Sequence, residues 1–120
     1  MDESTGVNIT AEKGVSLIAF QGDSISSVEA IADASTRISD YLTRTKPKRV
    51  VFDFAGVKFF SSQVLGLLLD VRAKLKPLHG RVVISSIDPR LHRVFKITNL
   101  DRIFNFYPDK DAAVNALNTA

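Results

Sequence analysis

Apolar and polar residues alternate near the start of the chain and then give way to a mostly apolar run. Val7, Ile9 and Ala11 alternate with polar residues, Lys13-Gly14 follows, and residues 15–20 are largely apolar. Alternation with a period of two is typical of a half-buried strand, and a short Gly-containing link between two such runs is typical of a hairpin. The chain is therefore predicted to begin with a β-hairpin.

The stretch from residue 49 to residue 75 combines a strand, a loop and a helix. Residues 49–54 are mainly β-branched and aromatic, with Arg49 at the start and Asp53 near the end, as expected for a strand covered on both faces. After Gly56 and a second apolar patch, Ser61 and Ser62 precede residues at helical spacing, where serine is a common N-cap. We expect Asp53 to end a central strand and a helix to follow the serines.

The helix after the serines has two different faces. Its buried stripe is predicted to contain Leu65, Leu68, Val71 and Leu75, and its other face contains Gln63, Gly66, Leu67, Asp70 and Lys74. Leu67 is either part of the core or an apolar contact for a partner, and we predict the second. Gly66 costs a helix about 1 kcal/mol relative to alanine, so a strand or a partner is expected to approach closely there.

An earlier helix and the elements that follow the central stretch are predicted from the same patterns. The earlier helix begins after a cap within residues 24–27, ends before Pro47, and would bury Val28, Ile31, Ala34, Ile38 and Leu42. Residues 81–84 predict a strand parallel to the central one, followed by a helix that opens at Asp88-Pro89 and buries Leu91, Val94 and Phe95. The last elements are a strand at 103–107 and a helix opened by Asp109 or Asp111, carrying Ala113, Val114 and Leu117.

This order of elements predicts the α/β class. We expect one domain over residues 1–120: a mixed β-sheet, formed by the N-terminal hairpin and then βαβα units, with helices packed on it. A length of 120 residues suits a single core without metals or disulfides. Residues 1–5 are polar and are expected to be flexible.

Composition and charge exclude several classes of protein. The chain has no cysteine, so it forms neither disulfides nor thiolate metal sites. No apolar run approaches the roughly 20 residues of a membrane span, so we expect a cytoplasmic protein that does not bind membranes. The net charge is +3, and basic residues cluster only at Lys46, Lys48, Arg49 and at Arg90, Arg93, Lys96. Such clusters are usually solvated, and no nucleic-acid binding is expected.

The common catalytic patterns are absent from the sequence. Only His79 and His92 are present, and neither lies near carboxylates at metal-ligand spacing. No phosphate-binding glycine loop occurs, and the paired serines do not stand in a G-x-S-x-G context. We therefore expect a binding protein without a cofactor, not an enzyme.

Several segments follow a known pattern. Residues 53–57, DFAGV, match a strand end of the type D-x-S/G-V, and residues 59–66, FFSSQVLG, match F-I-D-S-S-G-L-G. The later segments also follow the pattern. It continues with a strand at 80–84, GRVVI, and a helix from Asp88-Pro89 to Val94-Phe95, and TNLDRIF at 98–104 matches T-G-L-D-x-L-F. From about Val7 onward, the chain resembles a STAS domain of the anti-sigma-factor antagonist family.

The resemblance implies a partner and a site. An unmodified antagonist would bind an anti-sigma factor of the serine-kinase type, or another signalling protein, and free the sigma factor. The implied contact residues are Phe60, Ser61, Ser62, Gln63, Gly66, Leu67 and Asp70, with Asp23 from the loop after the second strand. In this chain the family's aspartate is Ser61, and the usual phosphate acceptor is Gln63. Ser62 is therefore the first candidate for phosphorylation and Ser61 the second.

Other interpretations stay open. Ser61 and Ser62 could act only as helix caps and never be modified. The protein would then be a phosphorylation-independent scaffold subunit of a larger signalling assembly, and the altered loop favours this alternative. A small-ligand or nucleotide binder rests only on the affinity of helix N-termini for anions. The expected oligomeric state is a monomer or a weak dimer.

Overall fold

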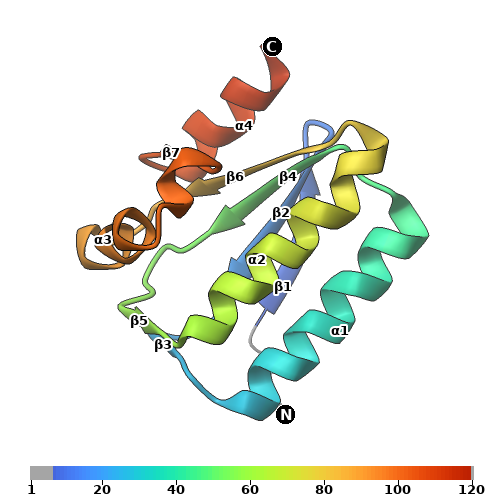
Figure 1. Ribbon diagram of the computed structural model, residues 1–120. Helices are drawn as coiled ribbons and strands as arrows, with labels where there is room; N and C mark the ends of the chain where they lie inside the picture. Colours follow the sequence, from blue (N-terminus) through green and yellow to red (C-terminus); the bar gives the residue numbers. More distant parts are fainter. Residues whose placement is uncertain (1–6, 120) are drawn as a thin grey trace.

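The main sheet has five strands in the order β1-β2-β4-β6-β7 (Figure 1). The computed structural model describes residues 7–119, so the expectation for residues 1–5 lies outside the described residues. β1 (Val7–Glu12) pairs antiparallel with β2 (Val15–Phe20). β2, β4 (Arg49–Asp53), β6 (Arg81–Ser85) and β7 (Asn105–Tyr107) are parallel. The predicted mixed sheet with an N-terminal hairpin is confirmed.

The hairpin turn consists of Lys13 and Gly14. Both have positive φ, at 53° and 79°. A two-residue turn with φ above zero at both positions matches the right-handed twist of the flanking strands, and glycine adopts that conformation without a steric cost. The turn therefore fixes the register, in which Glu12 lies opposite Val15.

Helices cover both faces of the sheet. α1 (Val28–Thr45) and α2 (Ser62–Leu75) lie side by side on one face, and α4 (Lys110–Asn118) lies on the other (Figure 1). α3 (Pro89–Ile97) adds Leu91 and Phe95 to the core on the α1–α2 side. Two short 3-10 helices, η1 (Lys76–Leu78) and η2 (Leu100–Arg102), follow α2 and α3.

β4 is the centre of the structure because both of its faces are buried. Val50 and Phe52 belong to the larger core beneath α1, α2 and α3, whereas Val51 belongs to the smaller core beneath α4. All three side chains are 0% exposed. This is the burial that a continuous apolar run in a parallel strand predicts.

The predicted caps are present at three helices. The N–H groups of Ala30, Arg90 and Ala112 donate to the side chains of Ser27, Asp88 and Asp109, at 3.2, 2.8 and 2.8 Å. α1 ends at Lys46, which has φ of 47°, and Pro47 follows. Each cap satisfies an N–H group that would otherwise lack a partner in the first turn.

Three predicted positions differ from the structure. Val28 is 64% exposed because it is the first residue of α1. The side chain of a helical residue points back over the preceding turn of its helix, and no helical turn precedes Val28. Val94 is only half-buried, at the edge of the stripe formed by Leu91 and Phe95. The last strand begins at Asn105, because Ile103 ends the 3-10 turn η2 and is partly exposed.

Leu67 was predicted to face a partner, and this prediction is wrong for the domain described here. The side chain is 6% exposed and belongs to the main core. α1 packs alongside α2, so the buried part of α2 is wider than the stripe that contacts the sheet. The predicted stripe of Leu65, Leu68, Val71 and Leu75 is buried as expected, and Val64 and Leu67 extend it.

Leu68→Ala should lower the free energy of unfolding by about 2 to 5 kcal/mol, because the fully buried side chain leaves a cavity. Leu69→Ala is the matched control, since Leu69 is partly exposed on the same helix. Urea unfolding of both variants measures the difference. Equal losses of stability would contradict the packing of α2 described above.

Leu67→Asp should destabilise the isolated domain by several kcal/mol, because a short carboxylate cannot reach water from a buried position. Gln63→Asp introduces the same charge at an exposed position one turn earlier and should melt close to the parent protein. Thermal unfolding followed by circular dichroism compares the two. A parent-like melting temperature for Leu67→Asp would restore the original prediction.

Candidate protein-interaction site

The loop that leads from β4 to α2 begins with a tight turn. The Val57 N–H donates to the Phe54 carbonyl at 3.0 Å, and Gly56 has φ of 82°, a conformation that favours glycine. The turn reverses the chain after Asp53, whose Oδ1 accepts a hydrogen bond from Ser85 Oγ at 3.0 Å. The loop therefore leaves the sheet at the carboxyl end of its central strand.

Phe60 anchors this loop in the core. Its side chain is 6% exposed, and its ring centroid lies 5.7 Å from that of Phe54 and 6.1 Å from that of Phe95. The prediction that Phe60 contacts a partner is therefore not supported by its burial. Its neighbour Phe59 is 53% exposed and was missed, although adjacent residues of a strand point to opposite faces.

Asp23, a proposed partner contact, lies beside the loop. Its carbonyl accepts hydrogen bonds from the N–H groups of Lys58 at 2.7 Å and Phe59 at 3.1 Å. The Ser61 N–H donates to the Ile25 carbonyl at 2.9 Å, where β3 (Ser24–Ile25) pairs parallel with β5 (Phe59–Phe60). This small second sheet was not predicted, and it joins the two loops into one surface.

The two serines occupy different positions at the start of α2. Ser61 is the N-cap residue, but its side chain makes no capping hydrogen bond, and its buried Oγ has no partner among the described residues. Ser62 is the first residue of the helix and is exposed. The first turn contains no acidic residue, so its free N–H groups and the helix dipole are available to an anion.

Four of the predicted residues share one groove. Gln63, Gly66, Leu67 and Asp70 line it from α2, and Val28, Ile31, Ala32 and Ser35 line it from α1. Gln63, Gly66 and Asp70 are exposed, whereas Leu67 forms part of the floor. Val28 was assigned to the core from its spacing and is instead an exposed apolar side chain at the groove.

Gly66 is not required by the packing of the domain. A Cβ atom built at this position meets no other atom within 4 Å. The expected close approach of a strand is therefore not found among the described residues, and the position opens onto the groove. A glycine that weakens its helix without an internal reason is consistent with the approach of another molecule.

Ion pairs hold the edges of the site. Lys74 pairs with Asp70 at 2.9 Å, and Lys58 lies 3.8 Å from Asp88, at the N-terminus of α3. Hydrogen bonds from Arg90 lower the pKa of Asp88 below its usual range, so this carboxylate stays charged near neutral pH. The ion pair between Lys58 and Asp88 therefore links the loop to the start of α3.

The described residues contain no metal-binding cluster and no membrane-spanning helix. Within residues 7–119, no group of three or more His, Asp or Glu side chains is placed to hold a metal ion. His79 is exposed, and the His92 ring packs 4.4 Å from that of Phe106. None of the described helices is both long and apolar enough to cross a membrane. What the site presents is an exposed hydroxyl, an open helix N-terminus and a groove.

A relative among known proteins matches part of this sequence. BtrV of Bordetella bronchiseptica, a protein assigned as an anti-sigma factor antagonist, is 32% identical over 73 residues, which are 61% of this chain and 63% of that protein. The chain thus matches less than two thirds of the length of this relative.

Solved structures share the fold over almost the whole chain. The antagonist-type STAS domain protein of Planctomyces limnophilus has a TM-score of 0.86 and 22% identity, covering 94% of this chain and 98% of that one. Unphosphorylated SpoIIAA, an anti-sigma factor antagonist, has a TM-score of 0.74 and 16% identity, covering 95% and 99%. A chain of the stressosome, a signal integration and transduction hub, has a TM-score of 0.70 and 14% identity, covering 92% and 96%.

These structural similarities show the fold. The family is shown by the sequence itself, because the model of the STAS domain matches residues 7–113. The two segments around β4 and α2 that carry the resemblance lie within that match. The chain therefore belongs to the STAS domain family.

Proposed function

We propose that this protein is a non-catalytic, cytoplasmic anti-sigma factor antagonist that binds an anti-sigma factor of the serine-kinase type and thereby releases a sigma factor. The observation that carries the proposal is the exposed Ser62 at the uncapped N-terminus of α2, beside the open groove at Gly66. The partner would contact Ser62, Gln63, Gly66 and Asp70. Asp23 and the exposed Phe59 would extend this surface across the neighbouring loops.

Phosphorylation of Ser62 would act on the interface and spare the fold. A phosphoserine carries about −1.5 to −2 charges, and at a helix N-terminus it meets free N–H groups and the positive end of the dipole. The same group buried against a partner without an opposing cation costs several kcal/mol. Modification would therefore abolish binding while the domain stayed folded.

Ser62 is favoured over Ser61 as the acceptor by accessibility. Ser62 is exposed, whereas Ser61 Oγ is buried and a kinase could reach it only after the loop opened. The burial of Phe60 between Phe54 and Phe95 opposes such an opening. Gln63, at the position where the family usually has the acceptor, cannot accept phosphate.

A second candidate is a phosphorylation-independent scaffold subunit of a signalling assembly. Gln63 favours the scaffold, because it stands at the position where the family usually has the serine that accepts phosphate. The similarity to a chain of the stressosome shows that the fold also occurs in such assemblies. The two candidates differ in whether Ser62 is ever modified.

Ser62→Asp should keep the circular dichroism spectrum and melting temperature of the parent and lose at least about tenfold in affinity for the anti-sigma factor, which is 1.4 kcal/mol. Ser62→Ala should bind like the parent and resist modification. Isothermal titration calorimetry with the kinase-type anti-sigma factor of the source organism measures both variants. Unchanged binding by Ser62→Asp would refute the switch.

Incubation with the same kinase and ATP, followed by phosphopeptide mass spectrometry, tests the modification itself. We expect phosphate on Ser62 of the parent and none on Ser62→Ala. If neither Ser61 nor Ser62 is modified while the kinase phosphorylates a control antagonist, the scaffold becomes the better account.

Gly66→Ala should separate stability from binding. Because the added Cβ meets nothing in the domain, the helix should gain up to about 1 kcal/mol of stability. The same methyl group should weaken the complex if the partner approaches the backbone there. Urea unfolding and calorimetry measure the two effects, and a variant that is more stable and binds normally would exclude Gly66 from the interface.

A further inference from the structure

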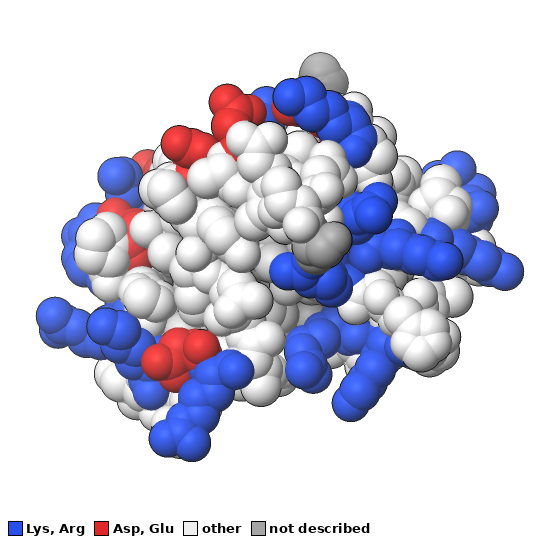
Figure 2. All heavy atoms as spheres, turned by 90° about the horizontal axis from the view of Figure 1, so that it is seen from above, with Lys and Arg blue, Asp and Glu red and all other residues white. Residues whose placement is uncertain are grey.

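Basic residues gather at the end of the molecule opposite the site described above. α1 and α2 end there, and β4 and β6 begin there, at the top of Figure 1. Seen from above, Lys and Arg side chains crowd the right-hand side, where α1 ends (Figure 2). Six cations from these segments form what we call the basic end: Lys46, Lys48, Arg49, Arg72, Lys76 and Arg81.

Backbone geometry brings these segments together. Arg49 and Arg81 are register partners on neighbouring parallel strands, about 5 Å apart at the backbone. Their side chains leave the sheet on the face that α4 covers, as those of Val51 and Val83 do. The Arg81 N–H also donates to the Lys48 carbonyl at 2.8 Å. Arg72, Lys76 and Arg81 line one hollow together, and no acidic residue lines it.

The charge of the basic end is not neutralised locally. Arg44 and Lys74 nearby have carboxylate partners, Asp40 and Asp70, but none of the six cations has an ion pair within residues 7–119. Residues 7–119 contain 16 Lys and Arg and 11 Asp and Glu, so the described residues outside the basic end are close to neutral. Such separation of charge concentrates a positive field at one end and attracts acidic partners.

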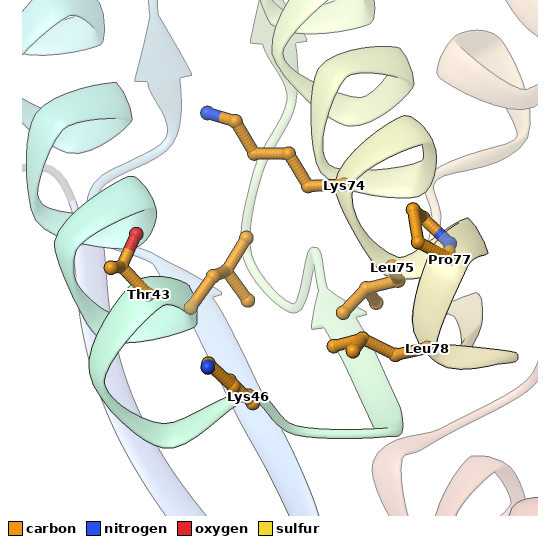
Figure 3. Close-up of a pocket in the computed structure, with 7 residues that line it drawn as sticks. Thr43, Lys46, Lys74, Leu75, Pro77 and Leu78 are labelled. Carbon is orange, nitrogen blue, oxygen red and sulfur yellow. The ribbon is translucent and has the colours of Figure 1, made fainter.

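An apolar hollow lies beside these cations (Figure 3). It has a volume of about 350 Å³, and Leu42, Leu75 and Leu78 form its apolar walls with Pro77. Leu75 and Leu78 point into the hollow from the α2 side, and Thr43 and Lys46 face it from α1 (Figure 3). Lys46 and Lys74 supply the charged rim. Apolar and cationic groups are thus available to the same ligand.

We propose that the basic end is a second docking surface, for an acidic segment of a partner protein that places one apolar side chain in the hollow between α1 and α2. Carboxylates of the segment pair with Lys46 at the rim of the apolar hollow and with Lys76. Lys76 lies between the wall residues Leu75 and Pro77 in the chain and lines the neighbouring hollow. The proposal does not depend on the antagonist function, because it concerns the opposite end of α2.

Other anionic partners fit these features less well. Neither hollow is lined by an aromatic side chain on which a nucleic-acid base could stack. Membrane surfaces are bound by apolar side chains that project outward, whereas Leu42 and Leu75 are buried at the bottom of a concavity. An apolar side chain flanked by acids matches both the shape and the charge.

Fluorescence anisotropy of the full chain with a labelled peptide tests the proposal. The probe is a short peptide of glutamates around one leucine, and its controls replace the leucine by serine or the glutamates by lysines. We expect saturable binding of the probe, weaker binding of the serine peptide and none of the lysine peptide. Raising the salt from about 0.1 to 1 M shortens the Debye length from about 10 to 3 Å and should weaken binding.

Two charge-reversal variants locate the surface. Lys46→Glu/Lys76→Glu should weaken binding of the probe by at least about tenfold, since each attraction becomes a repulsion. Arg93→Glu/Lys96→Glu changes the net charge equally on α3, where both residues are exposed, and should bind like the parent. Lys46→Gln/Lys76→Gln removes the two charges without reversing them. We expect an intermediate loss of affinity and a parent-like melting curve, which would show that the variants lose binding and not folding.

Three results would overturn the proposal. Equal losses in the two charge-reversal variants would mean that binding follows net charge alone. Equal binding of the leucine and serine peptides would remove the role of the hollow. Tighter, Lys46- and Lys76-dependent binding of duplex DNA or of phosphatidylserine vesicles than of the probe would assign the basic end to another class of partner.

Discussion

The burial of β4 on both faces is the constraint on which the rest of the structure depends. Val50 and Phe52 point to one face and Val51 to the other, and none of them is exposed. One layer of helices cannot cover both faces, so α4 must return to the side opposite α1 and α2. Because β4 pairs with parallel strands on both sides, its carboxyl end carries the loop that leads to the site.

The position of the site follows from aromatic packing beneath that loop. The rings of Phe20, Phe54, Phe60 and Phe95 form a continuous chain, with centroids 5.0, 5.7 and 6.1 Å apart. This chain runs from the sheet to α3 and passes under the start of α2. Ser62 is therefore presented at a fixed place, and binding requires little ordering of the loop, which lowers the entropic cost of association.

Local signals in the sequence predicted the five strands of the main sheet, the four α-helices and three of the helix caps, because those depend on neighbours along the chain. Gly14, Ser27, Asp88 and Asp109 act where their residue types indicate. Positions set by distant segments were predicted poorly. Leu67 is buried where α1 packs alongside α2, beside α1 residues such as Ile31 that lie far earlier in the chain, and no period within α2 encodes that contact.

The site shows the same division between local and distant signals. The serines, Gln63 and Gly66 were proposed from the pattern around α2, and Asp23 lies beside the loop that precedes them. Phe60 was proposed as a contact and Phe59 was missed, since the two-residue strand β5 has no alternation long enough to show which face is buried. The pairing of β5 with β3, which settles the question, links residues far apart in sequence.

α2 itself relates the two ends of the molecule. Its fourteen residues span about 21 Å, so a ligand at Ser62 and a ligand at the basic end would not contact one another. Cations near a helix C-terminus compensate the carbonyl groups and the negative end of the dipole, which accounts for residues such as Lys74 and Lys76. It does not account for Lys48, Arg49 and Arg81, which belong to the starts of strands. Capping therefore explains only part of the positive charge at this end of the molecule.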